Sequence, residues 1–270
     1  MIRGWPWARV LFGAAVAGAL AALVATIAGH DVPWWAIAAD ALALVAAIGA
    51  GVFLLGSGLF ARPILAVAPA RARDRLAITF DDGPDATHTP PLLELLERAG
   101  HRATFFVIGR RAEAAPELLA EIVRRGHGLG NHSYAHAYTT PFVHPTRLAA
   151  DLANAQEVMA RAGARVRFFR PPIGLLSPRV AEAARRIGLT IVGWSATARD
   201  GRASTTAETA AARLVAAARP GAILVLHDCV ERGARTPVAA AALPLLLEAL
   251  AARGLRSVTL DELISDEEKR

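Results

Sequence analysis

A chain of 270 residues can form one large α/β domain, or a smaller domain with an appendage. Its single cysteine, Cys229, excludes an internal disulfide framework and a zinc site built from several cysteines. The formal net charge is +6, and Lys269 is the only lysine among the 30 basic residues. The arginines form no single-face run with interleaved aromatic residues, so we expect no nucleic-acid partner.

The hydrophobic excess of the chain lies in its first 60 residues, where residues 10–29 and 41–61 contain no charged side chain. Each stretch is long enough to cross a hydrocarbon core about 30 Å thick at about 1.5 Å per residue. Tryptophans that suit a membrane interface precede both stretches: Trp5, Trp7, Trp34 and Trp35. The sequence therefore predicts a membrane anchor in residues 1–70, a two-helix transmembrane hairpin, and a separate domain in residues 71–270.

A cleaved signal peptide followed by a buried core helix is the alternative for these two stretches. The first stretch is longer than a typical signal-peptide apolar region, and a signal peptide does not explain the second. Asp40 lies near the start of the second stretch. We expect its carboxylate to reach the interface or to lie outside the membrane.

The arginines next to the two stretches indicate the side of the membrane. A hairpin puts both of its ends on one side, and its connecting turn contains no lysine or arginine. The positive-inside rule therefore places the ends and the following domain in the cytoplasm, as a two-pass protein of the cytoplasmic membrane. The arginines that carry this prediction are Arg3, Arg9, Arg62, Arg71, Arg73 and Arg75.

From residue 76 onward, short apolar runs alternate with helical patterns. About seven such strand–helix units predict an α/β fold with a parallel sheet, as a distorted or incomplete (β/α) barrel. A doubly wound open sheet is the second choice. The expected strands are 76–80, 103–107, 127–131, 167–170, 190–194, 222–227 and 256–260, and the expected helices are 91–99, 116–125, 146–162, 177–188, 206–218 and 237–253.

Polar residues that are able to do chemistry recur at or just beyond the ends of these strands. In a parallel barrel the carboxyl ends of the strands share one face, where the loops build the active site. We therefore expect these side chains to converge. They are Asp81 and Asp82, His132 and His136, Arg170, Asp200 and His227.

His132 and His136 are spaced so that both imidazoles can bind one metal ion from a single turn. Alone, this pair also fits surface or capping histidines, and the Asp-Asp-Gly-Pro run at Asp81 also fits a plain turn. Together, two imidazoles and a carboxylate form a common catalytic site for one divalent metal ion. Zinc is the expected ion, and cobalt or nickel suits the same ligands.

Four short motifs occur in a fixed order: Thr-Phe-Asp-Asp-Gly-Pro at 79–84, Gly-Asn-His-Ser-Tyr-Ala-His at 130–136, Arg-Pro-Pro-Ile-Gly at 170–174 and Leu-Val-Leu-His-Asp at 224–228. Over about residues 75–264, the chain resembles the polysaccharide deacetylases, the family-4 carbohydrate esterases with a nodulation-type deacetylase domain. The resemblance implies a metal-dependent hydrolase that removes N-acetyl groups from an amino sugar in a polysaccharide, an oligosaccharide or a lipid-linked glycan.

Carried over to this chain, the family pattern implies a role for each residue of the motifs. The metal ligands would be Asp82, His132 and His136. The catalytic residues would be Asp81 as general base, Arg170 holding its carboxylate, His227 as general acid and Asp200 orienting His227. The substrate-binding residues would be Ile173 through its backbone N–H, Leu226 in the acyl pocket, and Tyr134, which either reaches the substrate or covers the site.

The fourth family motif, Asp-x-x-Asp-Trp, is altered here. Thr197 replaces the first aspartate, Asp200 remains, and Gly201 stands where the tryptophan of the acyl pocket would be. The loss of this indole is expected to open the pocket to an altered acyl group, unless another loop supplies the wall.

Two other interpretations of the same motifs remain. The protein could hydrolyse O-acetyl esters or non-sugar amides, or it could be an inactive glycan-binding membrane protein. The expected partners are an N-acetylated glycan or lipid-linked sugar and the lipid bilayer, with no obligatory protein partner. By resemblance the domain would lie in the periplasm or outside the cell, which conflicts with the arginine distribution.

Overall fold

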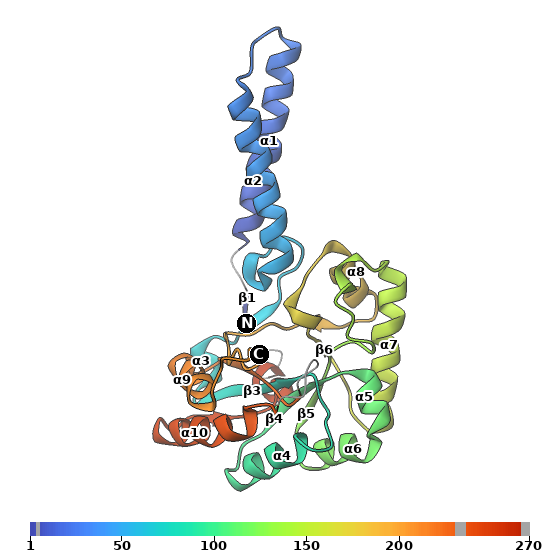
Figure 1. Ribbon diagram of the computed structural model, residues 1–270, viewed down its shortest axis with the longest axis vertical. Coiled ribbons are helices and arrows are strands. Elements are labelled where there is room, and N and C mark those ends of the chain that lie inside the picture. Colours follow the sequence, from blue (N-terminus) through green and yellow to red (C-terminus); the bar gives the residue numbers. More distant parts are fainter. Residues whose placement is uncertain (4–5, 230–235, 266–270) are drawn as a thin grey trace.

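The protein is described here by a computed structural model, which covers residues 1–3, 6–229 and 236–265 (Figure 1). A helical hairpin projects from an α/β domain. The helices are α1 (Trp7–Ile27), α2 (Trp34–Phe53), α3 (Pro69–Ala72), α4 (Thr89–Arg98), α5 (Gly109–Ala114), α6 (Pro116–Arg124), α7 (Pro145–Arg161), α8 (Pro178–Arg186), α9 (Ala207–Ala217), α10 (Ala239–Ala252) and α11 (Leu260–Ser265). The strands are β1 (Ile2–Arg3), β2 (Ile64–Ala66), β3 (Arg75–Asp81), β4 (Ala103–Val107), β5 (Gly128–Asn131), β6 (Phe168–Phe169), β7 (Thr190–Ile191), β8 (Ala196–Thr197), β9 (Ile223–His227) and β10 (Arg256–Ser257).

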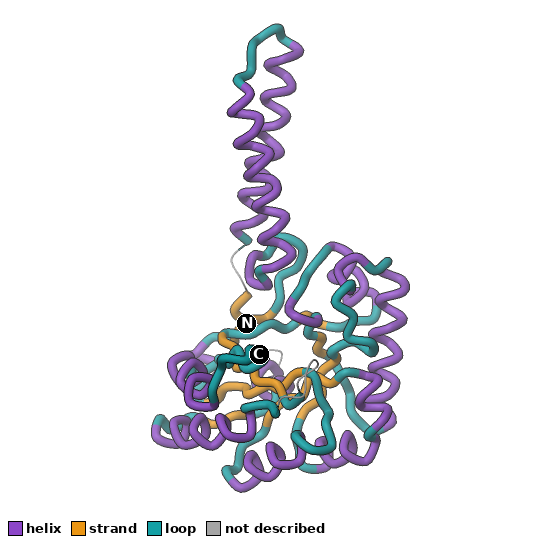
Figure 2. The backbone as a smooth tube through the Cα atoms, in the orientation of Figure 1, coloured by secondary structure: helices purple, strands orange, loops and turns teal. Residues whose placement is uncertain are grey.

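The central sheet is parallel and curls on itself (Figure 2). Its strand order is β7-β6-β5-β4-β3-β9-β8, with β10 also paired to β3. From β3 to β7 each strand lies beside the next one in the chain, and β9 returns to the other side of β3. This order confirms the predicted incomplete barrel. A doubly wound sheet would instead reverse its direction of growth at a switch point.

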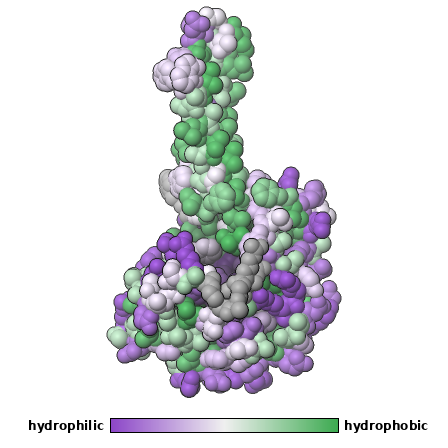
Figure 3. Space-filling model, in the orientation of Figure 1, coloured by the Kyte–Doolittle hydropathy of each residue, from purple (hydrophilic) through white to green (hydrophobic). Residues whose placement is uncertain are grey.

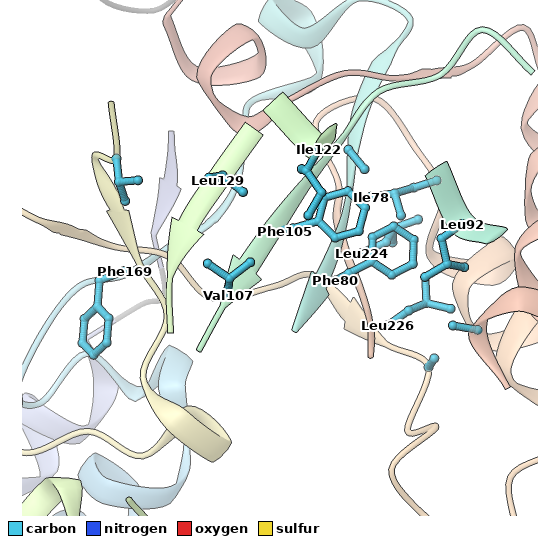
Figure 4. Packing of buried hydrophobic residues seen from close by; sticks show 14 of the residues in the cluster. Ile78, Phe80, Leu92, Phe105, Val107, Ile122, Leu129, Phe169, Leu224 and Leu226 are labelled. Atoms are coloured by element: carbon cyan, nitrogen blue, oxygen red, sulfur yellow. The ribbon is translucent and has the colours of Figure 1, made fainter. Parts of the chain in front are cut away.

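Successive side chains of each strand point to opposite faces of the curled sheet, so one set packs in a core between the sheet and the helices and the other set points into the interior of the barrel. In β3, Ile78 and Phe80 point toward the surrounding helices and join the core cluster that contains Leu92 of α4 (Figure 4). A second buried cluster includes Phe106 and Ile223 and fills the interior of the sheet. The intervening residues of β3 carry the polar side chains of the site.

The segment that precedes the domain fills the gap in the curled sheet. Ile64 in β2 forms a parallel bridge with Val192, and the Val67 N–H donates to the Gly221 carbonyl at 2.8 Å. β1 pairs with β2 in the antiparallel sense. Three residues of alternating burial are too short a pattern to indicate a strand, so the sequence did not predict this closure.

The hairpin contains two helices that are long and apolar enough to cross a bilayer, by length and composition. The expected second stretch, 41–61, is misplaced. α2 begins at Trp34 and ends at Phe53, because absence of charge does not mark a helix end. Asp40 therefore lies inside α2, where a side chain on Gly18 would meet its Oδ1 at 2.5 Å. Trp5 lies outside the described residues.

The closure of the curled sheet by the β2 segment can be tested by substitution of Gly221. Its φ is +80°, and an added Cβ would lie 2.0 Å from the Val67 carbonyl oxygen, so Gly221→Ala combines backbone strain with a clash. Gly254 is a matched control, since its φ is +63° and nothing lies within 4 Å of the same position. We predict that Gly254→Ala lowers the free energy of unfolding by about 1 kcal/mol, and that Gly221→Ala lowers it by roughly 3 kcal/mol or more. Thermal unfolding of the detergent-solubilised protein measures both, and equal losses would contradict the closure.

Candidate active site

The polar residues at the strand ends meet in one cavity of about 380 Å³. The register of the sheet explains part of this convergence, because Asp81 of β3 and His227 of β9 are direct neighbours. The other side chains come from the loops that follow β3, β5, β6 and β8. Of the predicted site residues, the cavity is lined by Asp81, Asp82, His132, His136, Ile173 and His227.

Asp82, His132 and His136 form a compact set of metal-ligand atoms. The Asp82 Oδ1 lies 3.3 Å from the His132 Nε2 and 3.2 Å from the His136 Nε2. One ligand atom from each residue lies within 4.8 Å of the others. Donors that share one ion at about 2.0–2.1 Å lie roughly 3 Å apart, so the donor set fits a divalent cation.

The orientation of His132 is fixed by a second hydrogen bond. Its Nδ1 lies 2.8 Å from the Arg170 carbonyl oxygen, which only accepts, so Nδ1 carries the proton. The Nε2 lone pair then faces the Asp82 carboxylate and is available to a metal ion. This arrangement, a ligating histidine that donates its other N–H to a carbonyl, is usual at metal sites.

The charge of Asp82 also suits the binding of a metal ion. Burial would raise the pKa of this carboxyl group, but its close contacts with the imidazoles of His132 and His136 and the charge of His227 lower the pKa well below its ordinary value. The Asp82 side chain is therefore an anionic ligand at neutral pH.

Left-handed backbone conformations direct the ligands toward one another. The φ angles are 78° at Asp82, 63° at Ser133 and 50° at His136. Non-glycine residues rarely adopt this region, and such strain clusters at functional sites. At Asp82 it turns the side chain toward the histidines, while the neighbouring Asp81 points elsewhere.

Asp81 is held by a fully buried arginine. The Arg170 Nη1 donates to the Asp81 Oδ1 at 2.6 Å and to the Thr79 Oγ1 at 2.9 Å, and Nη2 donates to the Gly193 carbonyl at 2.9 Å. The guanidinium also lies 4.0 Å from the centroid of the Phe106 ring. These contacts fix the position of the Asp81 carboxylate and balance its charge.

His227 is paired with Asp200 in the same way. The His227 Nδ1 lies 2.7 Å from the Asp200 Oδ1, and the His227 backbone N–H donates to the Asp200 Oδ2 at 2.8 Å. Burial lowers the pKa of His227. The hydrogen bond and charge of Asp200, with the charges of Asp81 and Asp82, outweigh that effect and raise the pKa to about 9. His227 therefore carries a proton at neutral pH.

Asp228 is a site residue that the sequence did not single out beyond its place in a motif. Its Oδ2 accepts from the Thr89 Oγ1 at 2.7 Å, and its backbone N–H donates to the Asp81 carbonyl at 3.2 Å. A Cβ on Gly83 would lie 2.0 Å from the same carboxylate oxygen. Asp228 thus packs directly against the end of β3 and the turn that carry Asp81 and Asp82.

Two predicted substrate-binding residues lie elsewhere. Leu226 is fully buried on the side of the sheet that faces the helices (Figure 4), because alternate residues of β9 face opposite ways, and Val225 lines the cavity instead. The Tyr134 hydroxyl donates to the Glu113 Oε2 at 2.5 Å, outside the cavity. Tyr138 lines the cavity, with its ring 5.8 Å from that of His136.

Within the part of the chain that the structure describes, the altered fourth motif leaves one part of the cavity wall open. Thr197 and Gly201 both line the cavity, and nothing lies within 4 Å of a Cβ built on Gly201. The indole of Trp194 forms a different wall, since it packs against Gly174 so closely that a Cβ there would lie 2.6 Å from the ring.

Known proteins are similar to this chain in sequence and in fold. The sequence model of the polysaccharide deacetylase family matches residues 69–192. A peptidoglycan-N-acetylglucosamine deacetylase of Bacillus cereus is 35% identical over 191 residues, which are 70% of this chain and 87% of that protein. A chitooligosaccharide deacetylase of Azorhizobium caulinodans is 35% identical over 188 residues, which are 66% of this chain and 88% of that protein.

A solved structure of a family 4 acetyl xylan esterase from Clostridium thermocellum, in complex with a cobalt ion, superimposes with a TM-score of 0.65. It is 33% identical, and the match covers 73% of this chain and 96% of that one. Most of the domain thus matches relatives in sequence and in fold, and it carries a buried Asp-His-His metal-ligand set at the expected strand ends. The chain belongs to the polysaccharide deacetylase family.

Proposed function

We propose that this protein hydrolyses the N-acetyl group of an N-acetylated amino sugar in a glycan. The observation that carries the proposal is the presence, in one cavity, of a three-residue metal-ligand set, a carboxylate held by Arg170, and a protonated His227. Its relatives of 35% identity are named as deacetylases of peptidoglycan N-acetylglucosamine and of chitooligosaccharides, which contain this type of sugar.

Asp82, His132 and His136 would hold one divalent cation. We propose zinc, although the related esterase structure contains cobalt and the same ligands suit nickel. When bound, such an ion polarises a carbonyl group and lowers the pKa of a bound water. Three protein ligands leave positions open for water and substrate.

Asp81 would accept the proton of the attacking water. Its Oδ1 is bonded to Arg170, so the carboxylate cannot turn away from the cavity. Arg170 is a positioning residue in this scheme. It holds the carboxylate of the base in position while remaining out of contact with solvent, at 0% exposure.

Negative charge develops on the amide oxygen during the attack. We propose that the backbone N–H of Ile173 donates to it, because Ile173 lines the cavity in a left-handed conformation with φ of 54°. One preorganised donor of this kind typically supplies about 3 kcal/mol of transition-state stabilisation. His227 then protonates the departing nitrogen, and Asp200 holds the imidazole so that Nε2 carries the transferable proton.

An O-acetyl ester is a second candidate substrate, favoured by the likeness to an acetyl xylan esterase. The same residues would serve it, since only the leaving group differs. An inactive glycan-binding role is less well supported, because every metal ligand, the base and the acid are present and in contact with their partners.

The open part of the cavity wall at Gly201 affects the size of the acyl group that the cavity can accept. We propose that the cavity accepts acyl groups larger than acetyl at this position, because no side chain of the described residues fills the space beside Gly201. A tryptophan introduced by Gly201→Trp should restore a preference for acetyl, and an unchanged acyl preference would reject this role for Gly201.

We propose that residues 1–70 anchor the protein in the cytoplasmic membrane and that residues 71–270 form the catalytic domain. Contacts between the first residues of the chain and the segment that follows α2 support an anchor that is retained rather than cleaved. The Arg3 Nη1 donates to the Arg62 carbonyl at 3.0 Å, and the Arg9 Nε donates to the Leu59 carbonyl at 3.0 Å.

The arginines beside the hairpin favour a cytoplasmic domain, where a lipid-linked sugar would be the accessible glycan. Relatives named for peptidoglycan favour the opposite face. Activity of an alkaline phosphatase fused to the C-terminus would require export, so an inactive fusion supports the cytoplasmic face and an active one rejects it.

The role of Asp81 as base is tested by Asp81→Asn. We predict that release of acetate from N-acetylglucosamine oligomers falls by roughly 10²- to 10⁴-fold, the usual contribution of a general base, while zinc binding by calorimetry is retained. Asp82→Asn is the contrasting variant, since it should weaken zinc binding itself. Full activity of the metal-loaded Asp81→Asn protein would show that another group is the base.

The role of Asp200 is tested by the pH dependence of kcat/KM. Because the pKa of His227 is raised to about 9, the acid is protonated below that pH and activity is lost as the pH rises through it. Asp200→Asn removes the group that raises this pKa, so we predict that the alkaline limb moves to lower pH. Asp74→Asn, at an exposed carboxylate far from the motifs, is the control. An unmoved alkaline limb in Asp200→Asn would contradict the assignment of His227.

A further inference from the structure

The base of the hairpin is built into the wall of the catalytic cavity. The Leu176 N–H donates to the Val52 carbonyl in the last turn of α2, at 3.1 Å. Leu176 lies two residues beyond Gly174, which lines the cavity. The end of the second apolar helix and the cavity loop are therefore held in direct contact.

A second contact joins the end of the hairpin to another part of the cavity wall. Leu55, just beyond α2, is 7% exposed and joins the main core of the domain. Its Cδ2 would lie 2.4 Å from a Cβ on Gly193, the residue before Trp194 of the cavity wall. The base of the hairpin is thus packed against the cavity wall rather than joined to it only by a linker.

These contacts set the depth of the cavity relative to a bilayer. α2 ends at Phe53, and Phe53 and Leu54 are 71% and 53% exposed. Two residues of extended chain, from Leu176 to Gly174, span at most about 7 Å. The headgroup region on each side of a bilayer is about 5–8 Å thick. A hairpin that spans the hydrocarbon core therefore brings the cavity to the level of the headgroups.

Exposed apolar side chains also lie on the domain, at the cavity and in the loop that follows Tyr138. Ile173 at the cavity is 56% exposed, and Phe142 is 74% exposed. Phe142 follows the loop of Tyr138, and its carbonyl accepts from the Arg179 Nη1 at 2.5 Å, close in sequence to Leu176. In Figure 3 the hydrophobic colour of the hairpin passes onto the adjoining surface of the domain. Exposed apolar groups that adjoin a membrane helix are suited to contact with lipid.

We infer that the substrate is an amino sugar carried by a membrane lipid, with the lipid remaining in the bilayer while the N-acetyl group enters the cavity. This inference rests on the proposed deacetylase function. It follows from the depth of the cavity, because a sugar attached to a lipid headgroup lies at that level. Confinement of enzyme and substrate to one surface also raises their effective concentration.

The test uses the full chain reconstituted in phosphatidylcholine vesicles and two substrates with the same sugar. One is a soluble N-acetylglucosamine oligomer, and the other is an N-acetylglucosaminyl glycolipid inserted in the vesicles. We expect the glycolipid to be deacetylated with the higher kcat/KM. Phe142→Ser should lower that value by roughly tenfold, the effect of losing one buried phenyl group, and leave turnover of the soluble oligomer unchanged. Leu245→Ser, at a 42% exposed leucine on α10, should change neither.

The outcomes separate the two proposals. Equal or better turnover of the soluble oligomer, or equal effects of Phe142→Ser on both substrates, would overturn the lipid-linked substrate and leave the deacetylase function intact. Failure to hydrolyse either substrate would reject the deacetylase function, and the inference about the lipid with it.

Discussion

Two adjacent aspartates, Asp81 and Asp82, place their side chains in one largely buried cavity, and the rest of the site depends on how the two side chains are kept apart. The left-handed conformation of Asp82 separates the two side chains. One meets the guanidinium of Arg170, and the other meets two imidazoles. Without these partners, two like-charged groups would lie unpaired in the same cavity, where a buried charge without a partner is costly.

The barrel supplies those partners because its parallel strands end at one face. β9 returns beside β3, so that His227 lies next to Asp81 in register. β6 delivers Arg170, whose backbone carbonyl orients His132 while its side chain holds Asp81. One residue therefore couples the metal-ligand set to Asp81, and the contacts of Leu55 and Val52 hold the wall of the cavity against the two apolar helices of the hairpin.

Much of this could be predicted from the sequence, because strand ends and metal-ligand spacing are local patterns. The barrel and the convergence of Asp82 with His132 and His136 follow from them. A motif does not show which face of a strand a residue occupies, so the position of Leu226 on the helix side of the sheet could not be predicted, and neither could the position of Tyr134 outside the cavity. The closing strand β2 and the limits of α2 depend on tertiary contacts that short apolar runs do not reveal.

The central claim is that Asp82, His132 and His136 hold one divalent cation beside Asp81 and His227. Anomalous diffraction at the zinc edge, from crystals of the zinc-loaded protein, measures this most directly. We predict a single strong peak within bonding distance of all three ligands, about 2 Å from each. A peak at another group of residues, or none at these three in a protein that binds zinc, would contradict the claim.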